Sequence, residues 1–236
     1  MIRSHQLMTK TNKKPPLNFA QYQRLHNVIH SLNRFFNEND GRSCVFFSLT
    51  GAALMHKHYN LNAKVTCGGG AVLLDPKSET VLSWFTQNPD GSLTTGQDAF
   101  HAWVECDGWL IDFMAPNYRE ATIGATRSIV NPRPVDSLPP VFVPPRMMLQ
   151  KRIDQTEGSL DDMSKPGDCV FVPHPEVTAS IIDRAFDRPS FLDVINIASI
   201  WHRPVPKKME QEMTITDDRG EISTIKLVNR GLSGMW

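Results

Sequence analysis

The chain has 236 residues, of which 40% are hydrophobic and 21% charged, ordinary proportions for a globular protein that exclude a fibrous or low-complexity chain. Its 25 basic and 25 acidic residues cancel, so no overall field concentrates nucleic acid or an anionic membrane around it. The expected partner is therefore small or uncharged, with no nucleic acid and no membrane.

The N-terminus carries no recognisable secretory signal. Residues 1–16 are basic and end in two prolines, but they lack the apolar run that such a signal requires. We expect them to form a disordered leader to one domain over 17–236. The most apolar stretch, CVFFSLTGAALM, is too short and too interrupted by polar residues to span a bilayer, which favours a cytoplasmic protein.

Two helices are predicted first along the chain. Apolar residues recur every three or four positions over 18–37, which is typical of an amphipathic helix. The next segment, Cys44–Tyr59, is apolar at nearly every position up to Met55, so we expect protein to surround it on most sides. Ser43 is the expected N-cap, because its hydroxyl can accept hydrogen bonds from free amides of the first turn. Cys44 then lies at the start of a buried helix.

Short β-like runs follow the helices. They read AKVTC, AVLLD, TVLSWF, AFHAWVEC and WLIDF, and they are separated by GGG, DPKSE, NPDGSLTTGQD and DG. A meander of strands after two helices indicates an α+β fold rather than alternating α/β. Six prolines over 131–145 exclude a helix or central strand there and predict an extended wrapping segment. The remaining predictions are strands at Cys169–Pro173, 210–216 and 221–228 and helices at 176–186 and 191–201.

The segment FHAWVECDGWLIDF carries the most information, because Asp-Gly between two β-like runs is a strong signal for a two-residue hairpin. That turn places Trp103 opposite Asp112, with Asp112 diagonal to His101 and within reach of its side chain. Since side chains alternate along strands, the hairpin separates into two faces. One face holds His101, Trp103, Glu105, Leu110, Asp112 and Met114, and the other, purely core face holds Ala102, Val104, Cys106, Trp109, Ile111 and Phe113.

Three residues on these elements form a candidate catalytic set. A buried carboxylate such as that of Asp112 is costly unless it is paired, and His101 supplies the partner. Cys44 at a helix start completes the nucleophile, base and orienting group of thiol catalysis. The helix N-terminus and a nearby imidazolium both favour the thiolate. In this scheme Cys44 attacks, His101 carries the proton and Asp112 fixes the tautomer, while the Cys44 amide and another donor bind the oxyanion.

The stretch HAWVECDGWLIDFMAP resembles the core of transglutaminase-like domains, with matches at His101, Trp103, Glu105 and Asp112. More broadly, the order of a cysteine opening a buried helix, a histidine on one strand and an aspartate on the next resembles the papain-like superfamily and its arylamine N-acetyltransferase-like branch. The likeness covers roughly residues 17–118 and also extends to an uncharacterised bacterial family placed in that superfamily. It implies a catalytic-type core over 17–118, with a C-terminal extension over 119–236.

Two features depart from these families. Transglutaminase-like cysteines commonly have a neighbouring tryptophan, whereas Cys44 lies between Ser43 and Val45. Papain-like enzymes place a glutamine shortly before the nucleophile, whereas this chain reads ENDGRS there. Asn39 and Ser43 are therefore the candidate oxyanion donors, and Trp103 is the candidate for substrate contact.

The other thiols and the histidines give no metal site. Cys67, beside the GGG run, is expected to be a structural thiol before a hairpin, and Cys106 to be core filler. His56 and His58 are two positions apart on a helix and point in different directions, so they cannot readily share an ion with Cys67. We expect neither a metal nor a cofactor.

The sequence thus predicts acyl transfer through a thioester on Cys44, with a small molecule or a peptide or protein amide as substrate. Hydrolysis, amide exchange and acetyl transfer share that intermediate and stay open, as does a toxin or effector that deamidates protein glutamines. The alternative from another class is a binding module in which an inherited triad survives without activity. The unidentified oxyanion donor and the unmatched C-terminal half motivate this alternative.

Overall fold

The structure is a computed structural model that describes residues 14–36, 43–124 and 142–236. Most of the predicted leader and most of the proline-rich segment over 131–145 lie outside these ranges. The described chain is mixed α+β with a mostly antiparallel sheet, as predicted. Its helices are α1 (Phe19–Phe36), α2 (Cys44–Tyr59), α3 (Tyr118–Gly124), α4 (Pro175–Phe186) and α5 (Pro189–Trp201), with 3-10 turns at Ala115–Asn117, Ile153–Gln155 and Leu160–Asp162.

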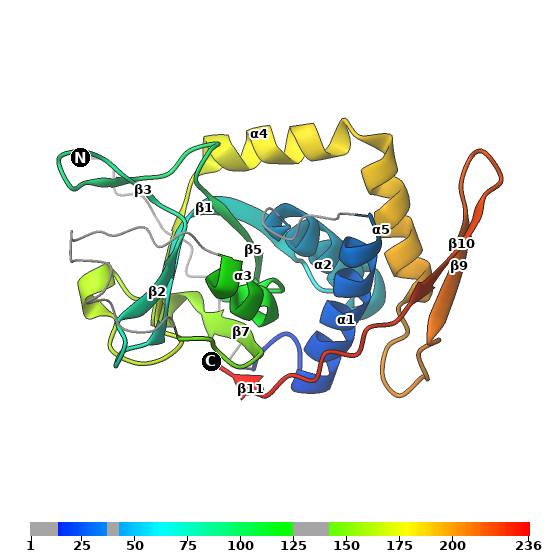
Figure 1. Ribbon diagram of the computed structural model, residues 1–236, viewed down its shortest axis with the longest axis horizontal. Helices are drawn as coiled ribbons and strands as arrows, with labels where there is room; N and C mark the ends of the chain where they lie inside the picture. Colours follow the sequence, from blue (N-terminus) through cyan, green and yellow to red (C-terminus); the bar gives the residue numbers. More distant parts are fainter. Residues whose placement is uncertain (1–13, 37–42, 125–141) are drawn as a thin grey trace, which may run out of the picture.

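Helices α1, α2 and α5 contact one another, and α2 lies against the sheet (Figure 1). The predictions for α1 and α2 are confirmed, and α2 is buried along most of its length. Gly51 allows this helix to approach the sheet closely, because a Cβ there would lie 2.2 Å from the Phe113 ring. Ser48 fastens the contact, since its hydroxyl donates to the carbonyl of Ala102 over 2.8 Å. The start of α2 is thereby held against the hairpin strand.

The strands form one large sheet and two small ones. The seven-stranded sheet has the order β11-β7-β6-β5-β1-β2, with β8 also paired to β1. Strand β11 is parallel to β7, and the other pairs are antiparallel. Residues after 118 therefore supply β7, β8 and β11 to the sheet that carries the site. The strands are β1 (Lys64–Asp75), β2 (Thr80–Ser83), β3 (Thr86–Gln87), β4 (Leu93–Thr94), β5 (His101–Cys106), β6 (Trp109–Asp112), β7 (Met147–Arg152), β8 (Cys169–Pro173), β9 (Glu212–Thr216), β10 (Ile222–Lys226) and β11 (Gly234–Met235).

The predicted hairpin is confirmed. Asp107 and Gly108 both have positive φ, 50° and 81°, as a type I′ turn requires. The register pairs Cys106 with Trp109 and Glu105 with Leu110, so the alternation of faces follows the prediction as far as Asp112, where β6 ends. The prediction for Met114 is wrong, because this residue lies beyond the strand and packs in the core cluster shared with α1 and α2. Two hydrophobic clusters result, one shared by β5 and β6 with α1 and α2, and a smaller one on the other face that includes Trp103, Leu110 and Tyr118.

The prediction that the GGG run separates two strands is wrong. Residues 68–70 lie inside β1, which is long enough to pair with β5, β8 and β2 in succession. Cys67 is accordingly a buried strand residue rather than a thiol before a hairpin. The glycines are there because neighbouring groups come too close for side chains: a Cβ on Gly68 would lie 2.0 Å from the Val172 carbonyl oxygen, and one on Gly69 would lie 1.9 Å from the Phe85 ring.

Replacing Gly68 by alanine is expected to lower the free energy of unfolding by about 3 kcal/mol. The added methyl meets a backbone atom of β8, which cannot turn aside as a side chain can. Urea unfolding followed by circular dichroism measures the loss. Gly96→Ala is the matched control, because a Cβ there meets nothing within 4 Å and φ is not positive. Equal unfolding midpoints for the two variants would contradict the expected crowding.

Candidate active site

His101 and Asp112 form a buried pair across the hairpin, as predicted. His101 Nε2 lies 2.6 Å from Asp112 Oδ2, and both side chains are fully buried. Strand β5 begins at the histidine and β6 ends at the aspartate, so their diagonal relation follows from the type I′ turn. The turn chemistry of the loop therefore fixes the contact between the two site residues.

Asp112 is held by further hydrogen bonds that the sequence did not predict. Its Oδ2 also accepts from the Tyr118 hydroxyl at the start of α3, and its Oδ1 accepts from the Met114 amide over 2.8 Å. The Tyr22 hydroxyl of α1 donates to the backbone carbonyl of Asp112. Burial and the Asp112 charge raise the pKa of both tyrosines well above 10, so both remain neutral donors. Asp112 is thus held from two helices and its own loop, with its carboxylate bound by α3 and the loop and its backbone carbonyl by α1.

Cys44 opens α2, the helix that packs on β5, and β5 begins at His101. The thiol lies close enough to His101 to help raise the pKa of its imidazole. Because Asp112 occupies Nε2, Nδ1 is the ring nitrogen left for Cys44. This contact is looser than a standard hydrogen bond, since Nδ1 has no conventional partner among the described residues. Loose contacts of this kind are common in catalytic sites without substrate.

The surroundings of His101 favour its charged form. Burial alone lowers the pKa of His101, but the charge of Asp112 and its hydrogen bond, together with the interactions with Cys44, raise it to about 10. These interactions favour the imidazolium form of His101, which pairs with Asp112 and lies close to the Cys44 thiol.

The other three cysteines are buried thiols with raised pKa values. Burial raises the pKa of Cys67 to about 12, that of Cys106 to about 11 and that of Cys169 to about 12. All four thiols are free, and Cys44, 8% exposed, is the most accessible of them. Core packing explains Cys106 as predicted, and the position of Cys44 beside an imidazolium is unique among the four.

Trp84 is a site residue that sequence reasoning missed. Its ring stacks on His101 with centroids 3.9 Å apart and an interplanar angle of 18°. It comes from the residue after β2, and its backbone amide donates to the Gly70 carbonyl over 2.8 Å. Nothing in the run TVLSWF signals this position, since the contact depends on β2 pairing with the far end of β1.

The remaining predicted site residues have different outcomes. Ser43 precedes α2, but its hydroxyl does not cap the first turn, so that prediction is wrong; its carbonyl accepts from the Phe47 amide over 2.9 Å. Asn39 lies outside the described residues. Trp103 is only 1% exposed and its indole donates to Glu105, so it supports the hairpin from within the core rather than offering a surface to substrate.

Among the described residues, the backbone amides at the start of α2 are candidate donors for an oxyanion. The first amides of a helix have no intrahelical acceptor, and the first helical hydrogen bond of α2 runs from the Phe47 amide to the Ser43 carbonyl. The amides at and just after Cys44 therefore point toward the helix start, where the dipole favours negative charge. This arrangement supplies the kind of donor that a developing oxyanion requires.

Within the described ranges, no group of three or more His, Cys, Asp or Glu side chains is placed to hold a metal ion. None of the helices in the described part of the chain combines the length and the hydrophobicity needed to traverse a lipid bilayer.

The fold and site define an α+β protein with a buried Cys44–His101–Asp112 constellation at the junction of a helix and a hairpin. Comparison with known sequences assigns it to a family: the profile described as "Protein of unknown function (DUF2026)" matches residues 18–236, and the chain belongs to that family. No curated protein matches the chain.

A solved structure is similar over nearly the whole chain. Its title is "The crystal structure of genomics APC5867", and the sequences are 28% identical. The superposition has a TM-score of 0.78 and covers 95% of this chain and 99% of the other. The overall architecture described above is therefore shared with that protein.

Proposed function

We propose that this protein is an acyl-transfer enzyme that forms a thioester on Cys44, in a papain-like or transglutaminase-like arrangement. One observation carries the proposal: His101 Nε2 lies 2.6 Å from Asp112 Oδ2, and Cys44 lies close enough to the same ring to help raise the pKa of His101. The order of the elements supports it, because a cysteine begins the helix that packs on the histidine strand and the aspartate ends the next strand. These are the parts that thiol catalysis needs.

The first half of the reaction follows from the charges. An imidazolium at His101 favours the thiolate of Cys44, which attacks the carbonyl carbon of an amide or ester. A carbon–sulfur bond forms, and the carbonyl oxygen becomes an oxyanion facing the amides at the start of α2. His101 then gives its proton to the leaving nitrogen or oxygen, whose bond to the carbonyl carbon breaks.

The second half releases the acyl group. Water or an acceptor amine attacks the thioester, His101 takes the proton from this nucleophile, and the carbon–sulfur bond breaks to regenerate the thiolate. Asp112 remains a carboxylate throughout and holds the ring in position through Nε2. Because water and amines enter the same step, hydrolysis and transfer use the same residues.

A second candidate function is a binding module without turnover. The observation that favours it is the burial of the site, since His101 and Asp112 are fully buried and Cys44 is 8% exposed. Trp84 also covers one face of the imidazole. In this case the triad serves only to stabilise the junction of α2 with the hairpin.

Acylation by p-nitrophenyl acetate separates the two functions. The wild-type protein is expected to release p-nitrophenol in a burst and to carry one acetyl group on Cys44, identified by mass spectrometry of peptides. Cys44→Ala is expected to slow the burst by about 10²-fold or more, because the nucleophile is gone. Cys106→Ala is the matched control and keeps the burst, since this thiol is buried in the core.

Two outcomes would reject acyl transfer in favour of binding. One is a folded wild-type protein that acquires no acetyl group. The other is a burst that Cys44→Ala leaves unchanged, which would place the reactive group elsewhere.

A further inference from the structure

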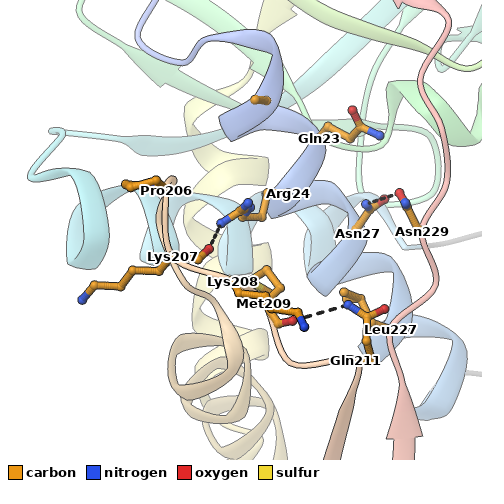
Figure 2. Close-up of a pocket in the computed structure, with 11 residues that line it drawn as sticks. Gln23, Arg24, Asn27, Pro206, Lys207, Lys208, Met209, Gln211, Leu227 and Asn229 are labelled. Carbon is orange, nitrogen blue, oxygen red and sulfur yellow. Dashed lines mark hydrogen bonds between the residues drawn. The ribbon is translucent and has the colours of Figure 1, made fainter.

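A cavity of about 500 Å³ lies apart from the candidate active site. It is open to solvent and is lined by α1, the loop that follows α5, and the C-terminal segment after β10 (Figure 2). Its volume falls within the range of small-molecule sites. None of its lining residues belongs to the triad; they are Ala20, Gln23, Arg24, Asn27, Pro206, Lys207, Lys208, Met209, Gln211, Leu227 and Asn229.

The walls of this cavity are cross-linked by hydrogen bonds. Arg24 Nη1 of α1 donates to the carbonyl of Arg203 over 2.8 Å and to that of Lys207 over 2.6 Å, which fastens the loop to the helix. The Leu227 amide donates to the Gln211 carbonyl over 2.7 Å, which joins the C-terminal segment to the same loop. The cavity is therefore largely formed before any ligand arrives.

The lining is cationic, although the chain as a whole is neutral. Three of the lining residues, Arg24, Lys207 and Lys208, are basic, and none is acidic. In the described part of the chain Arg24 forms no ion pair, and both of its hydrogen bonds leave from Nη1. Its Nε and Nη2 donors are thus available, on a guanidinium whose position is already fixed. Lys207 contributes mainly its carbonyl, because its ammonium points away from the cavity in Figure 2.

Carboxamides supply neutral donors elsewhere on the lining of the same cavity. Asn27 is already engaged at both ends of its amide, because its Nδ2 donates to Asn229 Oδ1 over 2.9 Å and its Oδ1 accepts from the Arg230 amide over 3.1 Å. This leaves the Asn229 Nδ2 hydrogens available, since no described residue accepts from them. Met209 and Leu227 add apolar surface on the same wall.

We propose that this cavity binds a small organic anion, with its phosphate or carboxylate group on Arg24, another polar group of the ligand at Asn229, and its carbon skeleton against the apolar wall. A guanidinium with two free donor positions matches an oxyanion with two acceptor oxygens. The absence of acidic lining residues removes the competitor that usually neutralises such an arginine. This proposed binding site does not depend on the proposed acyl-transfer function.

Thermal unfolding with three probes, inorganic phosphate, ribose 5-phosphate and succinate, tests the proposal on the full chain. Ribose 5-phosphate or succinate is expected to raise the wild-type Tm more than inorganic phosphate does. A larger increase in Tm with ribose 5-phosphate indicates a phosphate ligand, and a larger increase with succinate indicates a carboxylate ligand. Arg24→Gln removes the cation, and Asn229→Asp adds a negative charge while keeping the acceptor for Asn27. Both variants are expected to weaken binding about tenfold or more.

Gln97→Glu is the matched control, because it makes the same change of charge at an exposed residue that contacts Ser180 and does not line the cavity. It is expected to bind as the wild type does. Arg24→Gln also removes the hydrogen bonds that hold the loop after α5, so weaker binding by this variant could come from misfolding. Asn229→Asp keeps those hydrogen bonds and therefore tests binding without that effect. The proposal is overturned if no probe shifts the wild-type Tm, or if Asn229→Asp and Gln97→Glu bind equally. Equal shifts with inorganic phosphate and ribose 5-phosphate, and none with succinate, would overturn the assignment of an organic ligand.

Discussion

Replacing Asp112 by asparagine is expected to lower the free energy of unfolding by about 3–5 kcal/mol near neutral pH. The substitution removes the negative charge that pairs with the fully buried imidazolium of His101. The amide hydrogens of the new asparagine also face the Tyr118 hydroxyl or the Met114 amide, which are themselves hydrogen-bond donors. Urea unfolding at several pH values measures the loss. Asp168→Asn is the control, because that carboxylate is only partly buried and its loss should cost less.

The effect of Asp112→Asn on the free energy of unfolding should depend on pH. The pKa of His101 is raised from 6.5 to about 10 in the folded protein, so its contribution to stability is fully present below pH 6.5 and disappears as the pH rises through 10. Without the Asp112 charge, burial lowers the pKa of His101 instead. The gap in stability between wild type and Asp112→Asn should therefore narrow from pH 6.5 to pH 10. A gap that stays constant over this range would show that the pair is not ionised.

Iodoacetamide is expected to alkylate the native protein at Cys44 and to spare the other three cysteines. Cys67, Cys106 and Cys169 are buried thiols with raised pKa values, whereas Cys44 is 8% exposed and adjoins the His101 imidazolium. Replacing His101 by glutamine should slow the labelling of Cys44 at neutral pH by about tenfold or more, because the imidazolium that favours the thiolate is gone. Peptide mass spectrometry over time gives the rate at each cysteine.

His202→Gln is the control for this experiment, since His202 is also a buried histidine but its ring contacts Tyr59 and His58 rather than Cys44. In the His202→Gln variant, Cys44 should be labelled at the same rate as in the wild type. A Cys44 that stays unlabelled in the folded protein, or that reacts equally fast with and without His101, would make it a core residue and favour the binding module. Circular dichroism of each variant establishes that the comparison is made on folded protein.

Local patterns in the sequence were sufficient to predict the contact between His101 and Asp112. Asp107-Gly108 selects a type I′ turn, the turn fixes the register, and alternation along the strands places Asp112 on the same face as His101. The buried helix Cys44–Tyr59 was equally predictable, because its apolar residues surround the whole axis. In each case the structure depends on residues close together in the chain.

The contacts that complete the site depend on residues far apart in the chain. Trp84 reaches His101 only because β2 pairs with the C-terminal half of β1, and that strand continues through Gly68–Gly70, where glycines would otherwise suggest a turn. Likewise, the run MMLQKR lacks the pattern of a strand, yet it forms β7 because β6 offers it an edge.

The sequence alone determined the contact between His101 and Asp112 and the hairpin that joins them, because turn geometry and side-chain alternation are local properties. Only the tertiary structure decided what surrounds them: Trp84 on the imidazole, Tyr22 and Tyr118 on Asp112, and the cationic cavity beside Arg24. These contacts join residues up to about 200 positions apart, such as Asn27 and Asn229. Packing of the whole chain specifies such contacts, and no local pattern encodes them.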